Sequence, residues 1–143
     1  MKQPKGVRFT DMKLDYDKIK SFLTLLGDAH KPVLNTKEIF SELEYNVEND
    51  DHANEVFYYL NLLNDQGLID CLKDKNNDLG FQFLGHGELL IITKNFRLTM
   101  QGHQTLEAMS ENKVWKRIKE PLKNLGIGGL KQIPALALKL ILN

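Results

Sequence analysis

Residues 60–72 have the sequence LNLLNDQGLIDCL, and this stretch changes from one pattern to another within a few positions. Its first half has the leucine spacing of an amphipathic helix, and Leu68–Leu72 has the apolar character of a strand. Gly67 lies between them, where glycine takes the left-handed conformation that ends a helix without strain. The stretch therefore predicts a helix that leads directly into a strand.

Three helices are predicted up to this junction, because apolar residues recur at helical spacing over about 14–27, 36–44 and 52–65. Gly27 is expected to stop the first helix. Asn35 and Glu38 have the spacing of a capping box at the start of the second. The acidic residues 48–51 place negative charge before the third, which suits the dipole of a helix N-terminus.

After the junction the pattern is typical of short strands, which we expect at about 81–84, 89–93 and 96–99. Residues 73–79 are a polar turn region, and Gly85–Gly87 interrupts the strand pattern. Thr99 has the position of an N-cap for a further helix at about 101–111.

The C-terminal region is predicted to be helical as well. A helix is expected at about 113–125, where Pro121 should kink or restart it. Residues 126–129 are glycine-rich and indicate a flexible break. The tail at 130–143 is apolar nearly all round, so it should lie against the body of its own chain or pack with a second copy.

The order of helix, helix, helix, hairpin, helix resembles that of winged-helix proteins. Phe96, Leu98, Thr99 and Gly102 form an aromatic-x-Leu-Thr-x-x-Gly pattern, which is similar to the exit from the wing in many winged-helix regulators. In such a junction the threonine caps the next helix, and the glycine allows close packing against the wing.

A longer pattern, RLTxxGHxxLxxM, covers Arg97–Met109 and is followed by Trp115. It is similar to an uncharacterised family of small bacterial and phage-associated proteins that is known only as a domain of unknown function. The resemblance implies a winged-helix fold from about Leu14 to the C-terminal helix, and a prophage or mobile-element context. It implies no activity, cofactor or catalytic residue.

The composition is that of an ordinary globular protein. The chain has 143 residues, of which 27% are charged and 42% hydrophobic, so one folded body is expected. We divide it into a winged-helix domain at 1–112 and a helical extension at 113–143. A single cysteine excludes an internal disulfide. The first thirty residues hold no apolar signal region and no segment could span a membrane, so we expect a cytoplasmic protein without membrane contact.

The charges balance in total but not along the chain. Lysine plus arginine and aspartate plus glutamate number 19 each. Between Lys37 and Asp78 there are 3 basic and 11 acidic residues, a balance of −8, whereas Lys113–Asn143 has 7 basic and 1 acidic, a balance of +6. This segregation bears on the choice of partner, because local potential steers association.

DNA binding is one function to weigh, because the third helix of a winged helix enters the major groove in many regulators. Residues 52–65 contain no lysine or arginine and follow an acidic linker, which is a poor match to phosphate. Candidate DNA contacts are Asn54 and Asn61 on this helix and Lys73, Lys75 and Lys94 on the wing. Lys2, Lys5 and Arg8 could reach a groove from an N-terminal arm. For each lysine, simple solvation is the plainer interpretation.

Protein binding is the function that the sequence favours. The acidic region 38–55, together with Tyr45, Phe57 and Tyr58, combines charge and aromatic groups as interface anchors do, although Phe57 and Tyr58 could simply fill the core. Leu136 and Leu140 on the apolar tail are candidate contacts of a homodimer through the C-terminal helices. A host or phage protein is a further possible partner.

Enzymatic motifs are absent from the sequence. The four histidines and Cys71 show no metal-ligand spacing, and no serine stands in a nucleophile elbow. The glycines at 126–129 lack the Lys-Ser/Thr of a phosphate-binding loop. We therefore expect a non-catalytic interaction module without metal or cofactor, with a DNA-binding transcriptional regulator as the alternative.

Overall fold

The computed structural model describes residues 14–28 and 30–142, and it shows an α+β fold in which helices dominate, as the sequence predicts. The elements follow one another as α1 (Tyr16–Asp28), β1 (Leu34–Asn35), α2 (Thr36–Glu42), α3 (Asp50–Asp65), β2 (Ile69–Leu72), β3 (Phe81–Phe83), β4 (Leu89–Ile91), β5 (Asn95–Leu98), α4 (Met100–Ser110), α5 (Asn112–Leu125), the 3-10 helix η2 (Gly126–Gln132) and α6 (Ile133–Leu142).

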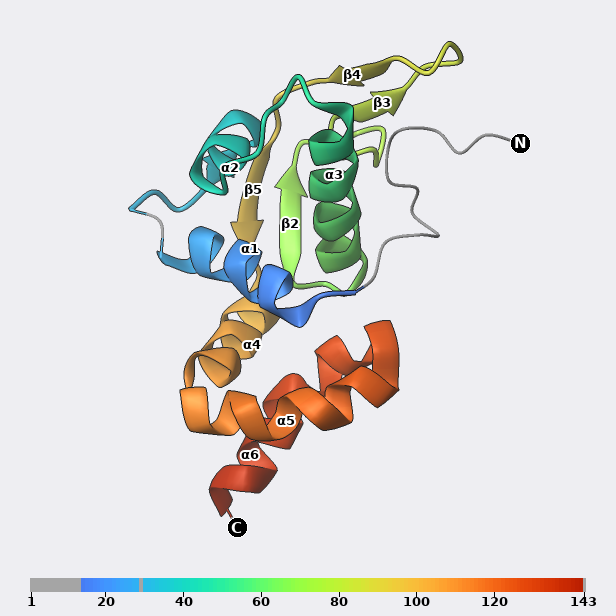
Figure 1. The fold of residues 1–143 in the computed structure, drawn as a ribbon. Coiled ribbons are helices and arrows are strands. Elements are labelled where there is room, and N and C mark those ends of the chain that lie inside the picture. The colour runs from blue at the N-terminus through green and yellow to red at the C-terminus, as the bar shows by residue number, and fades with distance from the viewer. Residues whose placement is uncertain (1–13, 29, 143) are drawn as a thin grey trace, which may run out of the picture.

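The strands form two small antiparallel sheets. A three-stranded sheet has the order β1-β5-β2, with Phe96 at the centre between Leu34 and Cys71. The strands β3 and β4 pair only with each other and form a hairpin that projects beyond this sheet (Figure 1). The sequence did not predict β1, because a strand of two residues is too short to show an alternating pattern.

The junction between α3 and β2 has the predicted left-handed glycine. Gly67 has a φ of 74°. Its N–H donates to the Asn64 carbonyl at 3.0 Å, and the Leu68 N–H donates to the Leu63 carbonyl at 2.9 Å. These two bonds are the Schellman arrangement that satisfies the last carbonyls of a helix. The chain therefore leaves α3 in a fixed direction and enters β2 at once.

The main core lies between α1, α2, α3 and the three-stranded sheet. Ile19, Leu60 and Phe96 are fully buried there, and the rings of Phe22 and Tyr59 stack with centroids 5.5 Å apart. The predicted capping box starts α2, since the Asn35 side chain accepts the Glu38 N–H and the Glu38 side chain accepts the Asn35 N–H. Burial of these apolar faces is the principal stabilising contribution.

Two helix boundaries lie one or two residues from the predicted ones. Helix α1 ends at Asp28, one residue after Gly27, and a Cβ on Gly27 would lie 2.4 Å from the Leu106 Cδ2 atom, so this glycine also allows the close approach of α4. Helix α3 starts two residues earlier than expected, at Asp50, because the Asn49 side chain accepts the N–H groups of Asp51 and His52.

The structure refines two expectations for the C-terminal region. Pro121 does not restart the helix, because α5 continues through it to Leu125. The glycine-rich segment does separate two α-helices, and residues 126–132 form the short 3-10 helix η2 between them. Pro121 therefore lies on a helix that tertiary contacts hold in place.

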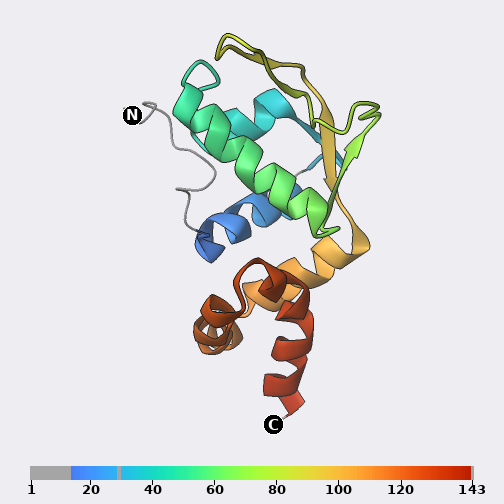
Figure 2. The same ribbon diagram turned by 90° about the vertical axis from the view of Figure 1, so that its right-hand side faces the viewer.

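The C-terminal helices pack on the rest of the chain. The Trp115 ring of α5 is 5% exposed and meets the Tyr16 ring edge-on at 6.3 Å. The Tyr16 hydroxyl donates to the Leu122 carbonyl at 3.1 Å. Helix α6 lies against α4 and α5, with Ile133 and Ala137 buried. Figures 1 and 2 show that these helices and the β3–β4 hairpin lie at opposite ends of the molecule.

None of the helices formed by the described residues combines the length and the apolar character that a membrane-spanning segment needs.

Candidate functional site

Helix α3 carries a row of side chains on the face that the core does not fully bury. Asp50, Asn54, Phe57, Tyr58 and Asn61 follow the spacing of one helical face, and each is exposed or half-buried. We call these five residues the α3 row. From Asp50 to Asp65 the helix contains no lysine or arginine. The row therefore presents carboxylate, amide and aromatic groups together, without a balancing cation on the same helix.

The β3–β4 hairpin lies against the aromatic part of the α3 row. The Phe57 ring has its centroid 5.2 Å from that of Phe81 and 5.2 Å from that of Phe83. Phe81 is buried, whereas Phe83 is 50% exposed. Phe83 thus extends the aromatic surface from the helix onto the hairpin. Helix α3 and the β3–β4 hairpin, which are distant in sequence, therefore share one aromatic surface, because the hairpin packs against the helix.

The two faces of the hairpin differ in what they contact. Phe81 pairs with Ile91 and Phe83 with Leu89, so these four side chains share the face that meets α3. Gln82 pairs with Leu90 on the opposite face. The alternation places Phe83 and Leu90 on opposite sides, although both are about half exposed.

The acidic charge of α3 is partly compensated from α1. The Lys18 Nζ atom lies 2.6 Å from the Glu55 Oε1 atom. Burial alone would raise the pKa of Glu55, but hydrogen bonds from Lys18 and the Tyr45 hydroxyl outweigh it and hold that pKa below its ordinary value. Burial, followed by the Glu55 carboxylate, raises the pKa of Tyr45. Within the described part of the chain, no ion pair compensates Asp50 and Asp51 at the N-terminus of α3, or Asp65 at its C-terminus.

Tyr45 lies apart from the α3 row. Its ring packs against the rings of Phe22, Phe40 and His52, with centroids 5.6 to 6.4 Å apart. It is half-buried at the edge of the core. Phe57 and Tyr58 also contact the core, yet both keep part of their surface exposed in the row.

The candidate DNA contacts form two separate groups. Asn54 and Asn61 belong to the α3 row, as defined above. Lys73 and Lys75 are exposed on the turn after β2. The Lys94 Nζ atom donates to the Lys73 carbonyl at 3.2 Å, and its side chain is half-buried. The structure therefore brings Lys73 and Lys94 together, but the Lys94 ammonium group already donates a hydrogen bond to a backbone carbonyl. The arm with Lys2, Lys5 and Arg8 lies outside the described residues.

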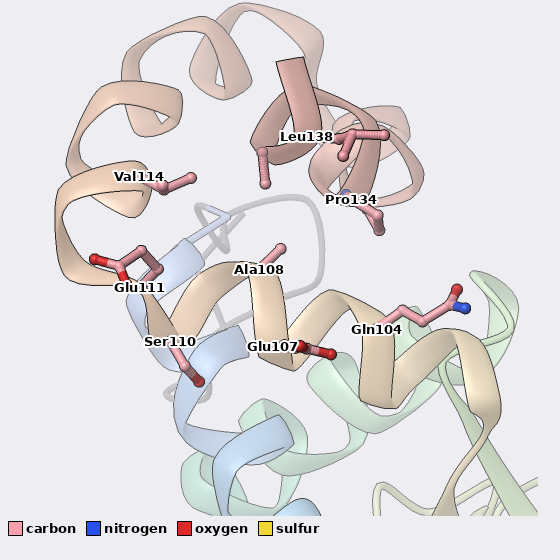
Figure 3. A pocket seen from close by; sticks show the side chains of 9 residues that line it. Gln104, Glu107, Ala108, Ser110, Glu111, Val114, Pro134 and Leu138 are labelled. Carbon is pink, nitrogen blue, oxygen red and sulfur yellow. The ribbon is translucent and has the colours of Figure 1, made fainter. Parts of the chain in front are cut away.

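A second surface feature is an open groove between the C-terminal helices (Figure 3). It has a volume of about 590 Å³, and its lining comes from α4, the start of α5, and α6. Ala108, Val114 and Ala137 supply apolar lining, and Glu107 and Glu111 supply carboxylates. Leu138, at one side of the groove, is 57% exposed.

The apolar tail uses its own chain for much of its burial. Leu130 and Ile133 are fully buried, and Leu136 and Leu140 are half-buried against the core. The tail was expected to pack either against its own chain or against a second copy, and the structure shows packing against its own chain. The exposed Leu138 and the groove beside it are what this packing leaves uncovered.

The described residues give little evidence of a metal site or of a reactive thiol. No group of three His, Cys, Asp or Glu side chains among them is placed to hold a metal ion. Cys71 is half-buried in β2, and burial raises the pKa of its thiol to about 11. A thiol with that pKa is almost entirely protonated near neutrality and is a weak nucleophile.

Two features of these surfaces were missed in the sequence. Phe83 was not identified as a surface residue, although the alternation of residues 81–84 with 89–92 could have assigned it to the face shared with Phe81. The groove could not be inferred, because it depends on the angle at which α6 returns across α4.

No curated protein and no solved structure matches the chain. A protein family does match: residues 13–128 fit the family described as "Hypothetical protein (DUF2513)". The match covers most of the chain, including every strand of both sheets and helices α1 to α5. The chain belongs to the DUF2513 family.

Proposed function

We propose that this chain is a winged-helix interaction module that binds a protein partner through the α3 row and Phe83. The winged-helix interpretation is supported by the order of elements, in which α1, β1, α2 and α3 are followed by β2, a hairpin and β5. It is further supported by the sheet order β1-β5-β2, which pairs the strands on either side of the hairpin. In this interpretation α3 is the recognition helix and the β3–β4 hairpin extends the wing.

The observation that carries the proposal is the contact between Phe57 and Phe83. It builds an aromatic surface at the place where a winged helix would meet DNA, and Asp50 and Asp51 lie one to two helical turns away on the same helix. Duplex DNA carries a dense negative charge, so carboxylates here would repel it. Half-exposed aromatic groups, in contrast, are typical anchors of protein interfaces.

The chemistry of the α3 row indicates the partner that fits it. A segment with an apolar or aromatic side chain could pack on Phe57 and Phe83. Lysine or arginine beside that side chain would meet Asp50 and Asp51, and such complementarity favours the correct partner and its rate of association. We therefore propose a basic, apolar-anchored segment of a host or phage protein, bound in the cytoplasm. The resemblance of the Arg97–Met109 pattern to phage-associated proteins supports that context.

The proposal is tested by selecting binders from a displayed library of random peptides. We expect enrichment of peptides that carry lysine or arginine around an aromatic or large aliphatic residue. Phe83→Ala should weaken their binding at least about tenfold, which corresponds to about 1.4 kcal/mol of binding free energy.

Leu90→Ala is the matched control, because Leu90 is similarly exposed on the opposite face of the same hairpin. It should leave peptide affinity unchanged. Two results would refute the proposed surface. The first is that the selected peptides share no common chemistry. The second is that they bind the Phe83→Ala protein and the wild-type protein equally.

We also propose that two copies associate through the groove beside α6. Leu138 of one copy would occupy the groove of the other, and Lys139 next to it would approach the carboxylates of Glu107 and Glu111. The exposure of Leu138, the apolar lining of the groove and the opposite charges support this arrangement. A two-fold dimer forms each contact twice, which suits a surface that contains both the groove and the side chain that fills it.

A further inference from the structure

Helix α5 has an exposed face that is strongly basic. Lys113, Lys116, Arg117 and Lys123 are all exposed, and Glu120 is the single acidic residue of the helix. The chain as a whole is neutral, so this face is a local concentration of positive charge. Helix α5 lies at the opposite end of the molecule from the start of α3 (Figures 1 and 2).

Three of these cations have no acidic partner among the residues that the structure describes. Within residues 14–28 and 30–142, no carboxylate forms an ion pair with Lys113, Lys116 or Arg117. Lys119, in contrast, lies 3.0 Å from the Asp17 carboxylate and 5.7 Å from the centroid of the Trp115 ring. The five cations of α5 therefore divide into Lys119, which holds the helix to α1, Lys123, which lies 3.3 Å from the Glu120 carboxylate, and the three that remain available.

The helix that carries these cations is held firmly. Trp115, Ile118 and Leu122 on its opposite side are at most 5% exposed. The Tyr16 hydroxyl also donates to the carbonyl of Leu122. The positions of the three cations are thus set by a packed helix, which lowers the conformational cost of using them together.

The chemistry of this face argues against two kinds of partner. A helix that lies on a membrane inserts its apolar side, and the apolar side of α5 is already buried in the protein. A protein interface relies on apolar or aromatic anchors, and the row Lys113, Lys116, Arg117, Glu120 contains none. What remains is a partner that is recognised by negative charge alone.

We propose that the exposed face of α5 binds the phosphate backbone of a nucleic-acid duplex without reading its base sequence. From Lys113 to Arg117 the helix rises about 6 Å at 1.5 Å per residue. That length matches about two intervals of 3.4 Å between phosphates of one strand, so the three cations match about three successive phosphates. Because this surface is separate from the α3 row, its binding does not depend on the proposed protein partner.

The test measures the fluorescence anisotropy of a labelled duplex of mixed sequence over a series of salt concentrations. One arm uses duplex DNA and another uses duplex RNA, since both offer the same backbone phosphates. The wild-type protein is compared with the triple variant Lys113→Gln, Lys116→Gln, Arg117→Gln. The control variant Lys37→Gln, Lys73→Gln, Lys75→Gln removes the same charge from exposed sites elsewhere, including the wing.

The wild-type protein should bind at least one duplex at low salt, with an affinity that falls steeply as salt rises. The α5 variant should lose at least about tenfold in affinity, and its salt slope should decrease by about 2.7, because each lost phosphate contact accounts for about 0.9. The control should keep most of its affinity. Preference for DNA or RNA would identify the source of the phosphates.

Three results would overturn the proposal. The first is no binding to either duplex at low salt. The second is an equal loss in the two variants, which would mean that binding depends on total charge and not on α5. The third is binding to vesicles of anionic lipid but to neither duplex. Circular dichroism of each variant should match that of the wild-type protein, because every substituted side chain is exposed.

Discussion

The hydroxyl of Thr99 donates a hydrogen bond to the carbonyl of Gly67 at 2.6 Å. The same hydroxyl accepts the Gly102 N–H at 3.0 Å and so caps α4. One side chain therefore joins the glycine that ends α3 to the first turn of the helix that follows β5. This bond explains why Leu-Thr-x-x-Gly stands between β5 and α4, since the threonine fixes how the start of β2 and the end of β5 meet.

Replacement of Thr99 by valine should destabilise the fold by about 1–2 kcal/mol, because it removes a helix cap and a second hydrogen bond while keeping the shape of the side chain. Urea denaturation measures the change. Thr93→Val is the matched control, since Thr93 is exposed in the loop before β5, and it should change stability by less than about 0.5 kcal/mol. Equal effects of the two substitutions would show that the junction does not depend on Thr99.

Gly102 should tolerate no side chain. A Cβ added there would lie 2.0 Å from the Leu68 carbonyl oxygen, so Gly102→Ala must push α4 away from the start of β2. We expect a loss of about 1–3 kcal/mol from overpacking, despite the better helix propensity of alanine. Thermal unfolding measures it, with Gly85→Ala as the control because nothing lies within 4 Å of a Cβ at that position. A Gly102→Ala variant as stable as the wild type would contradict the close approach.

The extent to which the sequence predicted this fold follows from the range of the interactions concerned. The capping box at Asn35, the left-handed Gly67 and the cap at Thr99 are local, and all three were predicted correctly. The close approach of Leu106 to Gly27 was not predicted, because Leu106 is distant in the chain. The continuation of α5 through Pro121 likewise depends on contacts with α1, so local propensity alone indicated a kink or restart.

The candidate surfaces divide in the same way. Helical periodicity places Asn54, Phe57, Tyr58 and Asn61 on one side of α3, and the structure agrees. The contribution of Phe83 to the aromatic surface depends on how the β3–β4 hairpin packs on α3, and no local sequence pattern encodes that packing. Whether residue 112 is a domain boundary stays a prediction, although α5 begins at that residue.

The ion pair between Lys18 and Glu55 should make stability depend on acid. The folded-state pKa of Glu55 lies below its ordinary value of 4.5, so its stabilising contribution is complete above that pH and is lost as the pH falls through the folded pKa. Glu55→Gln should be less stable than the wild type at pH 7 and should lose less stability on acidification to about pH 3. Urea denaturation at both pH values measures this.

Glu42→Gln provides the comparison for that measurement, because Glu42 is exposed on α2. Its acid-induced loss of stability should match that of the wild-type protein. The interpretation of Glu55 would be wrong if Glu55→Gln and Glu42→Gln changed the acid-induced loss of stability by the same amount.

Leu138→Asp should abolish the proposed dimer, because it places a carboxylate where the side chain would enter an apolar groove bounded by Glu107 and Glu111. Light scattering coupled to gel filtration should give the mass of two chains for the wild type and of one chain for the variant. Leu125→Asp is the control, since Leu125 is 50% exposed on α5 and does not line the groove. A wild-type protein that is monomeric at high micromolar concentration would contradict the arrangement.

The central claim is that the α3 row and Phe83 bind protein. Its most direct test is to record the amide NMR spectrum of ¹⁵N-labelled protein during titration with a peptide from the displayed library. The account predicts that the peptide shifts the amide signals of Asn54, Phe57, Tyr58 and Phe83 and leaves those of α5 in place. Shifts confined to other elements, or shifts of Asn54 and Asn61 on addition of duplex DNA in place of peptide, would contradict it.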